Sequence, residues 1–197
     1  MIDQTEIEAA KADLRRTLRA ARRAHAAALD PVIAGLVLRR PPSPIAALVP
    51  PGAKIGLYNA MPGEAPALGY ARHFHEAGHT VALPWFADRA TPMAFRRWAN
   101  PWVDDLLVPG PFGAQPAADE PVVVPDVLFV PLVGFTPDGA RLGQGGGHYD
   151  RWLAAHAGAL CVGLAWDCQK VDDLPREPHD RPLDAIVTPT TIYGPFA

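Results

Sequence analysis

The sequence predicts an α/β fold in which a mainly parallel β-sheet is flanked by helices. Short apolar segments recur along the chain, and stretches with helical periodicity separate them. The longest apolar segment, residues 127–135, is too short for a membrane helix but has the length of a buried strand. The 23 prolines are spread over the whole chain, which indicates short loops and no long disordered segment.

Length and composition favour one domain over residues 1–197 with a full hydrophobic core. Hydrophobic residues make up 49% and charged residues 20%, and the net charge of −3 does not call for a nucleic-acid partner. Residues 1–6 lack the layout of a signal peptide, and we expect no membrane association. Cys161 and Cys168 have the spacing of neither a redox nor a zinc motif, which favours a reducing, cytoplasmic setting.

Residues 5–29 form the clearest predicted helix, with Thr5 and Glu8 fitting a capping box. Its expected buried stripe consists of Leu14, Leu18, Ala21, His25 and Leu29. A neighbouring stripe is basic and consists of Lys11, Arg15, Arg19 and Arg22. The spacing alone leaves two interpretations open, a solvated basic face, which is the commoner case, or a surface from which Lys11 and Arg15 reach a phosphate.

The elements that follow are predicted in chain order. A short helix starts at Asp30 and ends before residues 39–44. The others are a strand over 54–60, a turn at 61–64, a helix over about 66–77, strands over 79–86 and 93–98, an irregular stretch over 100–120, a central strand over 126–135, a helix ending near Gly158, a strand over 160–166, an acidic loop over 167–182 and a last strand over 184–188. In parallel sheets ligands bind beyond the carboxyl ends of strands, which draws attention to residues 58–60, 134–135 and 166–167.

Residues 141–151 (RLGQGGGHYDR) are the most informative stretch, because four glycines fall within five residues between a strand and a helix start. Glycine permits positive φ angles and close approach of a ligand to the backbone. The N-terminus of the following helix adds about half a positive charge, so phosphate is the natural ligand. The stretch is not a Walker loop, because no Gly-Lys-Ser/Thr follows, and it fails the dinucleotide fingerprint because His148 stands where the third glycine belongs.

Three carboxylates are candidate site residues. Asp150 lies in a first helical turn, where an acid is favoured by the helix dipole alone, but beside a phosphate loop it can hold Mg²⁺. Asp180 is a second candidate metal ligand. Glu64 follows a strand through a Pro-Gly turn and is either the N-terminal carboxylate of the next helix or an anchor for a polar substrate edge. No Ser-His-Asp or Cys-His arrangement can be argued.

Residues 129–135 (FVPLVGF) followed by 139–151 (GARLGQGGGHYDR) resemble the 5-formyltetrahydrofolate cyclo-ligase family, also called methenyltetrahydrofolate synthetases. The resemblance covers nearly the whole chain and includes residues 11–15 (KADLR), Glu64, Gln169 and 174–180 (LPREPHD) in the same order. It implies an α/β fold related to sugar-phosphate isomerase and CoA-transferase folds. It also implies ATP- and Mg²⁺-dependent conversion of 5-formyltetrahydrofolate to 5,10-methenyltetrahydrofolate with release of ADP and phosphate. We expect the protein to act as a monomer.

The resemblance implies a role for each matching residue. In this mechanism ATP phosphorylates the formyl oxygen, N10 attacks the resulting iminium phosphate, and phosphate leaves. The implied nucleotide contacts are Lys11, Ala12, Asp13, Leu14, Arg15, Arg141, Leu142, Gly143, Gln144, Gly145, Gly146, Gly147, His148 and Tyr149. The implied folate contacts are Arg15, Glu64, Gln144, Gly145, Gly146, Gly147 and His148, and Asn59, at the end of the predicted strand over 54–60, is a further expected substrate contact. The implied Mg²⁺ ligands are Asp150 and Asp180, and Lys11, Arg141 and Asp150 are the implied catalytic residues.

Two positions depart from the family pattern. The family often has an aromatic or basic residue where Gln144 stands, and tyrosine where His148 stands. Two further functions remain open at this point. The chain could be a non-catalytic nucleotide- or phosphate-binding regulator on the same fold, or, less simply, a relative of the isomerases or CoA-transferases that acts without ATP.

Overall fold

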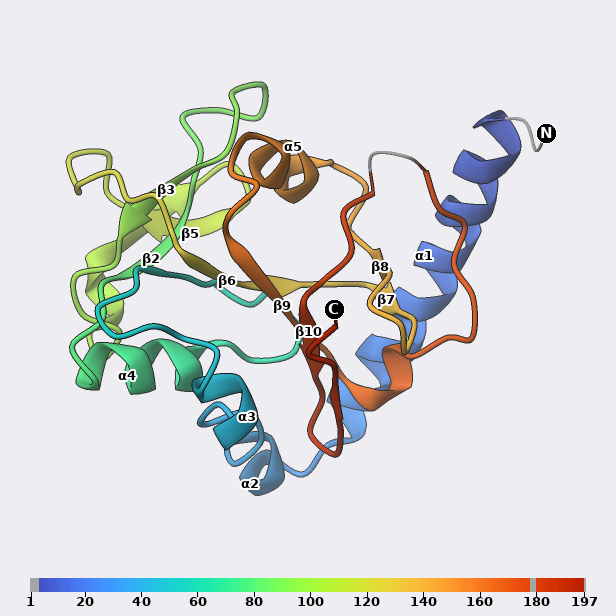
Figure 1. Ribbon diagram of the computed structural model, residues 1–197, viewed down its shortest axis with the longest axis horizontal. Helices are drawn as coiled ribbons and strands as arrows, with labels where there is room; N and C mark the ends of the chain where they lie inside the picture. Colours follow the sequence, from blue (N-terminus) through green and yellow to red (C-terminus); the bar gives the residue numbers. More distant parts are fainter. Residues whose placement is uncertain (1–3, 178–179, 197) are drawn as a thin grey trace.

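The computed structural model describes residues 4–177 and 180–196. Residues 178–179 of the predicted segment 174–180 (LPREPHD) lie outside the described residues. Within the described residues a seven-stranded sheet has the order β11-β10-β9-β6-β1-β2-β3 (Figure 1). Its strands are β1 (Ile55–Gly56), β2 (Val81–Trp85), β3 (Ala94–Arg97), β6 (Val127–Pro131), β9 (Leu160–Leu164), β10 (Ala185–Val187) and β11 (Ile192–Tyr193). The inner pairings are parallel and the two edge strands are antiparallel, which confirms the predicted mainly parallel α/β sheet.

The helices flank this sheet on both faces. They are α1 (Gln4–Ala28), α2 (Pro31–Ala34), α3 (Ser43–Ala46), α4 (Leu68–Glu76) and α5 (His148–Ala155), with 3₁₀ turns η1 (Asp104–Leu106) and η2 (Asp167–Gln169). Figure 1 shows α2, α3 and α4 on one side of the sheet, α5 on the other, and α1 beside the short β7–β8 pair. Asp30 caps α2 as expected, because its carboxylate accepts from the N–H of Val32 at 2.8 Å. None of the described helices is long and apolar enough to cross a membrane.

The predicted central strand over residues 126–135 is wrong as a single element. It divides into β6 and β7 (Gly134–Phe135), and β7 pairs antiparallel with β8 (Arg141–Leu142) in a sheet of its own. Pro131 is the last residue of β6 because proline offers no N–H to continue the ladder. The chain therefore leaves the main sheet at Pro131, and the β7–β8 pair leads it to the glycine-rich stretch.

The predicted irregular stretch over residues 100–120 is also wrong in part. It contains a hairpin of β4 (Leu107–Gly110) and β5 (Gly113–Pro116). The high Pro and Gly content hid this hairpin, yet Gly113 supplies the positive φ of 124° that its turn uses. The Gln115 side chain bonds both the N–H and the C=O of Phe86, which fastens the hairpin at the end of β2. The prediction also missed the short edge strand β11, and it extended β1 beyond Gly56.

The core lies in two layers, one on each face of the sheet. Alternate residues of β6 serve the two layers: Val127 and Phe129 pack toward Tyr70 of α4, and Leu128 and Val130 belong to the layer of Trp152 on α5. This explains why β6 is a continuous apolar run, since both faces of the strand are covered. A third, smaller cluster joins α1 to the β7–β8 pair and consists of Leu18, Val133, Ala140, Leu142 and Leu174.

Candidate functional site

A cavity of about 930 Å³ opens beyond the carboxyl ends of β1, β2 and β6, within the range of small-molecule sites. Its lining brings together predicted residues from distant parts of the chain: Lys11, Arg15, Asn59, Glu64, Arg141, Leu142, Gly143, Gln144, Gly145, Gly146, Gly147, His148, Tyr149, Asp150 and Asp180. Three residues carried over by the resemblance do not line it. Ala12 and Asp13 are exposed, and Leu14 packs against the small cluster around Leu18.

The glycine-rich stretch forms a turn that ends at the first residue of α5. Gly145 and Gly147 have φ angles of 100° and 62°, which confirms the expected positive φ. A Cβ on Gly145 would lie 3.4 Å from Cζ of Arg15, so the turn approaches α1 closely. Backbone N–H groups of a glycine-rich turn and of a helix start are donors of the kind that bind anions in proteins.

The basic stripe of α1 faces the glycine-rich turn, so the interpretation of a solvated basic face is wrong. Lys11 and Arg22 are only 5% exposed, whereas Ala21, expected in the buried stripe, is exposed. Arg15 Nε donates to the carbonyl of Gly143 at 2.9 Å. Arg19 Nη2 donates to the carbonyl of Gln144 at 2.7 Å. Sequence reasoning did not assign Arg19 and Arg22 to the site, although their helical spacing after Arg15 was the available signal.

Lys11 is held between two carboxylates at the cavity wall. Its Nζ lies 2.7 Å from Glu177 Oε2 and 2.6 Å from Asp180 Oδ2, and Asp180 also accepts from the N–H of Glu177. Burial lowers the pKa of Lys11, but the hydrogen bonds that Lys11 donates to Asp180 and Glu177, and the charges of these carboxylates, outweigh burial and leave the pKa raised. Lys11 is therefore charged at neutral pH. Glu177 was missed as a site residue, although it stands within the LPREPHD segment.

Arg141 and Asp150 form an ion pair at the other side of the turn. The Arg141 side chain is only 4% exposed, and its Nε has no hydrogen-bond partner among the described residues. Asp150 lies in the first turn of α5, with its side chain 26% exposed at the cavity. A buried guanidinium at a cavity wall suits an anionic ligand.

Asp150 and Asp180 both line the cavity and are the predicted ligands for a magnesium ion that would bind together with phosphate. No group of three or more His, Cys, Asp or Glu residues is arranged for a metal within residues 4–177 and 180–196. Mg²⁺ is usually bound by one or two carboxylates together with phosphate oxygens and water, so a dedicated protein cage is not required. Each of the two carboxylates now has a cationic partner, Arg141 for Asp150 and Lys11 for Asp180.

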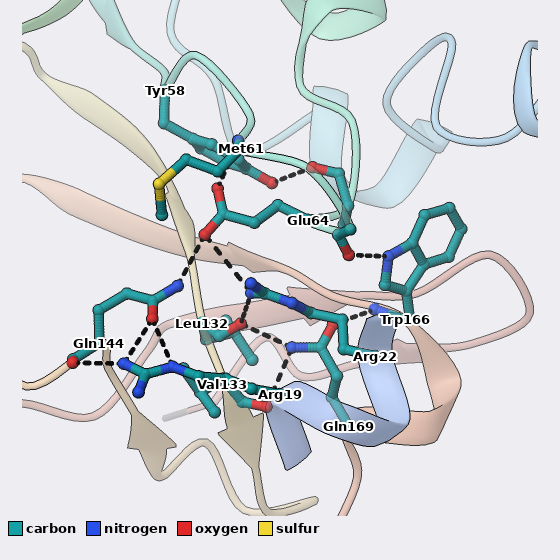
Figure 2. Close-up of polar contacts among 12 residues, drawn as sticks. Arg19, Arg22, Tyr58, Met61, Glu64, Leu132, Val133, Gln144, Trp166 and Gln169 are labelled. Carbon is teal, nitrogen blue, oxygen red and sulfur yellow. Dashed lines mark hydrogen bonds and ion pairs between the residues drawn. The ribbon is translucent and has the colours of Figure 1, made fainter. Parts of the chain in front are cut away.

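Glu64 is almost fully buried and forms hydrogen bonds with both carboxylate oxygens (Figure 2). Oε1 accepts from Gln144 Nε2 at 2.8 Å and lies 3.4 Å from Arg22 Nη1, and Oε2 accepts from the N–H of Met61 at 3.0 Å. Glu64 thus closes its own turn. The alternative that it caps the next helix is wrong, because α4 starts four residues later behind Ala67, with no side-chain cap.

Three rings form one wall of the cavity. Phe86, Phe112 and His148 have centroids 4.6, 4.9 and 5.2 Å apart. Burial and the charge of Arg151 lower the pKa of His148, so its ring is neutral at pH 7. Phe112 comes from the unpredicted β4–β5 hairpin, and Asn59 also reaches that hairpin by donating to Ala114 O at 3.2 Å. The wall was missed because its rings meet only when the hairpin folds against β2.

Comparison with known proteins identifies a family and a shared fold. The model of the 5-formyltetrahydrofolate cyclo-ligase family matches residues 7–189. The Escherichia coli K12 5-formyltetrahydrofolate cyclo-ligase is 47% identical over 85 residues, which cover 40% of this chain and 47% of that enzyme. The Mycolicibacterium smegmatis enzyme of the same name is 33% identical over 122 residues, 58% of this chain and 62% of that enzyme. The chain thus spans about half the length of the curated relatives that it matches.

Two solved structures share the fold. The 5,10-methenyltetrahydrofolate synthetase from Mycoplasma pneumoniae has a TM-score of 0.63 at 23% identity, over 89% of this chain and 96% of that one. The Aquifex aeolicus 5,10-methenyltetrahydrofolate synthetase has a TM-score of 0.63 at 24% identity, over 94% and 92%. The family match over residues 7–189 leads to one conclusion: the chain belongs to the 5-formyltetrahydrofolate cyclo-ligase family.

Proposed function

We propose that this protein catalyses the ATP- and Mg²⁺-dependent ring closure of 5-formyltetrahydrofolate to 5,10-methenyltetrahydrofolate, with release of ADP and phosphate. One observation carries the proposal. A single cavity has a glycine-rich turn backed by arginines on one side, and a buried carboxylate with an aromatic wall on the other. The first side suits a polyphosphate and the second suits a flat ring with polar edges.

At the phosphate side the chain supplies positive charge and fixed donors. Arg15 faces Gly145, Arg141 Nε has no hydrogen-bond partner within residues 4–177 and 180–196, and α5 starts directly after the turn. Phosphoryl transfer depends on positioning and charge neutralisation, which these groups are suited to provide. Mg²⁺ held by Asp150 and Asp180 would supply further neutralisation of the phosphate charge when it is bound.

At the folate side Glu64 is suited to accept hydrogen bonds from the amino group and ring N–H of the pterin. Phe86 and Phe112 offer apolar faces to the ring, and Asn59 adds a polar side chain at the same rim. The role of the chain at this side is to hold the formyl group in line with the phosphate and to exclude water.

In the proposed reaction the formyl oxygen attacks the terminal phosphorus of ATP, and the bond to ADP breaks. The product of this step is an iminium phosphate. N10 then attacks the formyl carbon and loses its proton, and phosphate leaves with the electrons of the C–O bond. No nucleophile from the protein is required, in keeping with Cys161, whose thiol pKa is raised to about 12 by burial.

The test is an assay with 5-formyltetrahydrofolate and Mg-ATP that follows the near-ultraviolet absorbance of the product and the release of ADP. We expect the product and ADP to form in equal amounts. No ADP release with this substrate would contradict the proposal. Calorimetric binding of the nucleotide without turnover would instead support a non-catalytic nucleotide-binding regulator.

A further inference from the structure

The side-chain amide of Gln144 lies between a cation and an anion (Figure 2). Its Oε1 accepts from Nε and Nη2 of Arg19 at 3.0 and 2.8 Å. Its Nε2 donates to Oε1 of Glu64 at 2.8 Å. The orientation of the amide is unambiguous, because a guanidinium only donates and a carboxylate only accepts.

The carboxylate of Glu64 has little capacity left for a ligand. A carboxylate has about four lone-pair positions. Gln144, Arg22 and the N–H of Met61 occupy three of them. A ligand edge with two adjacent N–H donors needs two acceptor positions, so one of the existing donors has to leave.

Gln144 is the donor that can leave most easily. Arg22 is buried and balances the charge of Glu64, and the N–H of Met61 belongs to the backbone of the same turn. Gln144 is neutral and half-buried at the cavity, and it has a glycine on either side. Arg19 also bonds the main-chain carbonyl of Gln144, so this residue keeps a partner after its side chain turns away.

We propose that Gln144 is a placeholder for the folate. In the ligand-free protein its amide N–H occupies the position at Glu64 that an N–H of the pterin takes, and folate binding displaces it. The inference rests on the proposed function. Gln144 is a positioning residue that acts through Glu64, and because it belongs to the glycine-rich turn, folate binding also changes the contacts of the turn that faces the phosphate.

If Gln144 is a placeholder, removing its side-chain N–H should raise the affinity for folate, although the loss of a binding-site residue usually lowers affinity. A donor that competes with the ligand lowers affinity, so its removal raises affinity, whereas removal of a merely structural support lowers it. In the Gln144→Met variant the new side chain has a similar length and carries no N–H donor. We expect this variant to bind 5-formyltetrahydrofolate about fivefold more tightly than wild type, the size of one hydrogen bond in net terms. The measurement is calorimetry without nucleotide, so that binding is separated from turnover.

A double-variant cycle shows whether the effect runs through Glu64. In a Glu64→Gln background, where wild-type affinity is already reduced, Gln144→Met should change affinity by less than about twofold. Weaker or unchanged binding of the single Gln144→Met variant, while wild type binds, would overturn the placeholder and leave the proposed function intact. Wild-type protein that binds no 5-formyltetrahydrofolate would instead overturn the proposed function, and this inference with it.

A second measurement uses wild-type protein and does not depend on the folding of any variant. The chain has four glutamines, Gln4, Gln115, Gln144 and Gln169, so selective ¹⁵N labelling gives four side-chain NH₂ pairs. We expect the pair of Gln144 to shift on addition of 5-formyltetrahydrofolate, while the pair of the buried Gln169, which donates to Leu132 O and Val133 O, stays in place. Four unchanged pairs in the bound protein would overturn the placeholder.

Discussion

Arg15 Nε donates a hydrogen bond of 2.9 Å to the carbonyl of Gly143, a residue 128 positions later in the chain. The same guanidinium faces Gly145, so the first helix forms one wall of the glycine-rich turn. The turn lies in the C-terminal half of the chain, whereas Arg15 and Arg19, which bond it, lie near the N-terminus. We therefore expect phosphate binding at this turn to depend on the docking of α1 as much as on its own glycines.

Gly145→Ala tests the backbone of the turn. The φ of 100° disfavours any residue with a Cβ, and the new methyl group would lie 3.4 Å from the Arg15 guanidinium. We expect a loss of about 1–2 kcal/mol in the free energy of unfolding and a several-fold higher KM for ATP. Gly158→Ala is the matched control, because nothing lies within 4 Å of its Cβ position. Equal KM values for the two variants would contradict the role of the turn.

Lys11→Ala tests the cation between Glu177 and Asp180. We expect the KM for ATP to rise more than the KM for 5-formyltetrahydrofolate, because the lost charge lies at the phosphate side. Chemical denaturation should show a loss of about 2–4 kcal/mol, since two carboxylates lose their shared partner. Arg16→Ala on the same helix is the control, because Arg16 is exposed and its one ion pair among the described residues is with the exposed Asp13. A larger effect on the folate KM would refute the phosphate role.

Asp150→Asn tests the candidate metal ligand with little change in side-chain volume. We expect lower turnover and a higher Mg²⁺ concentration at half-maximal rate, because a neutral amide is a poor ligand for Mg²⁺. The measurement is a steady-state Mg²⁺ titration at saturating substrates. Asp173→Asn, at an exposed position outside the cavity lining, should titrate like wild type. An unchanged titration of Asp150→Asn would remove Asp150 from the metal site.

The lowered pKa of His148 predicts that the stability of the protein depends on pH. Its pKa in the folded protein lies below the ordinary value of about 6.5, so the unfolded chain binds more protons between these two values. The free energy of unfolding should therefore fall as the pH drops from about 6.5 through the lowered folded pKa. His148→Phe removes the titrating group and keeps a ring against Phe86 and Phe112. Denaturant unfolding at pH 7 and pH 5 should show a shallower pH dependence in the variant, and identical slopes would contradict this prediction.

Much of the site was predictable because its signals are local. The glycine-rich stretch predicts positive φ angles, and Gly145 and Gly147 have positive φ angles in the structure. Helical spacing showed that Lys11, Arg15, Arg19 and Arg22 share one stripe, but this pattern is the same for a solvated face and for a buried one. The aromatic wall was not predictable, because Phe112 reaches Phe86 only through a hairpin whose Pro and Gly content resembles a loop.

The sequence by itself determined the mainly parallel α/β sheet, the glycine-rich turn before α5 and the likeness to the cyclo-ligase family. The pattern of apolar residues and the backbone freedom of glycine act over a few residues, so they can be recognised from the sequence without the tertiary structure. The tertiary structure decided that the basic stripe of α1 faces the turn, that Glu64 closes its own turn, and that Gln144 lies between Arg19 and Glu64. The two bonds of Gln144 join residues 80 and 125 positions apart, and the packing of α1 against the β7–β8 pair brings Arg19 to the turn that holds Gln144.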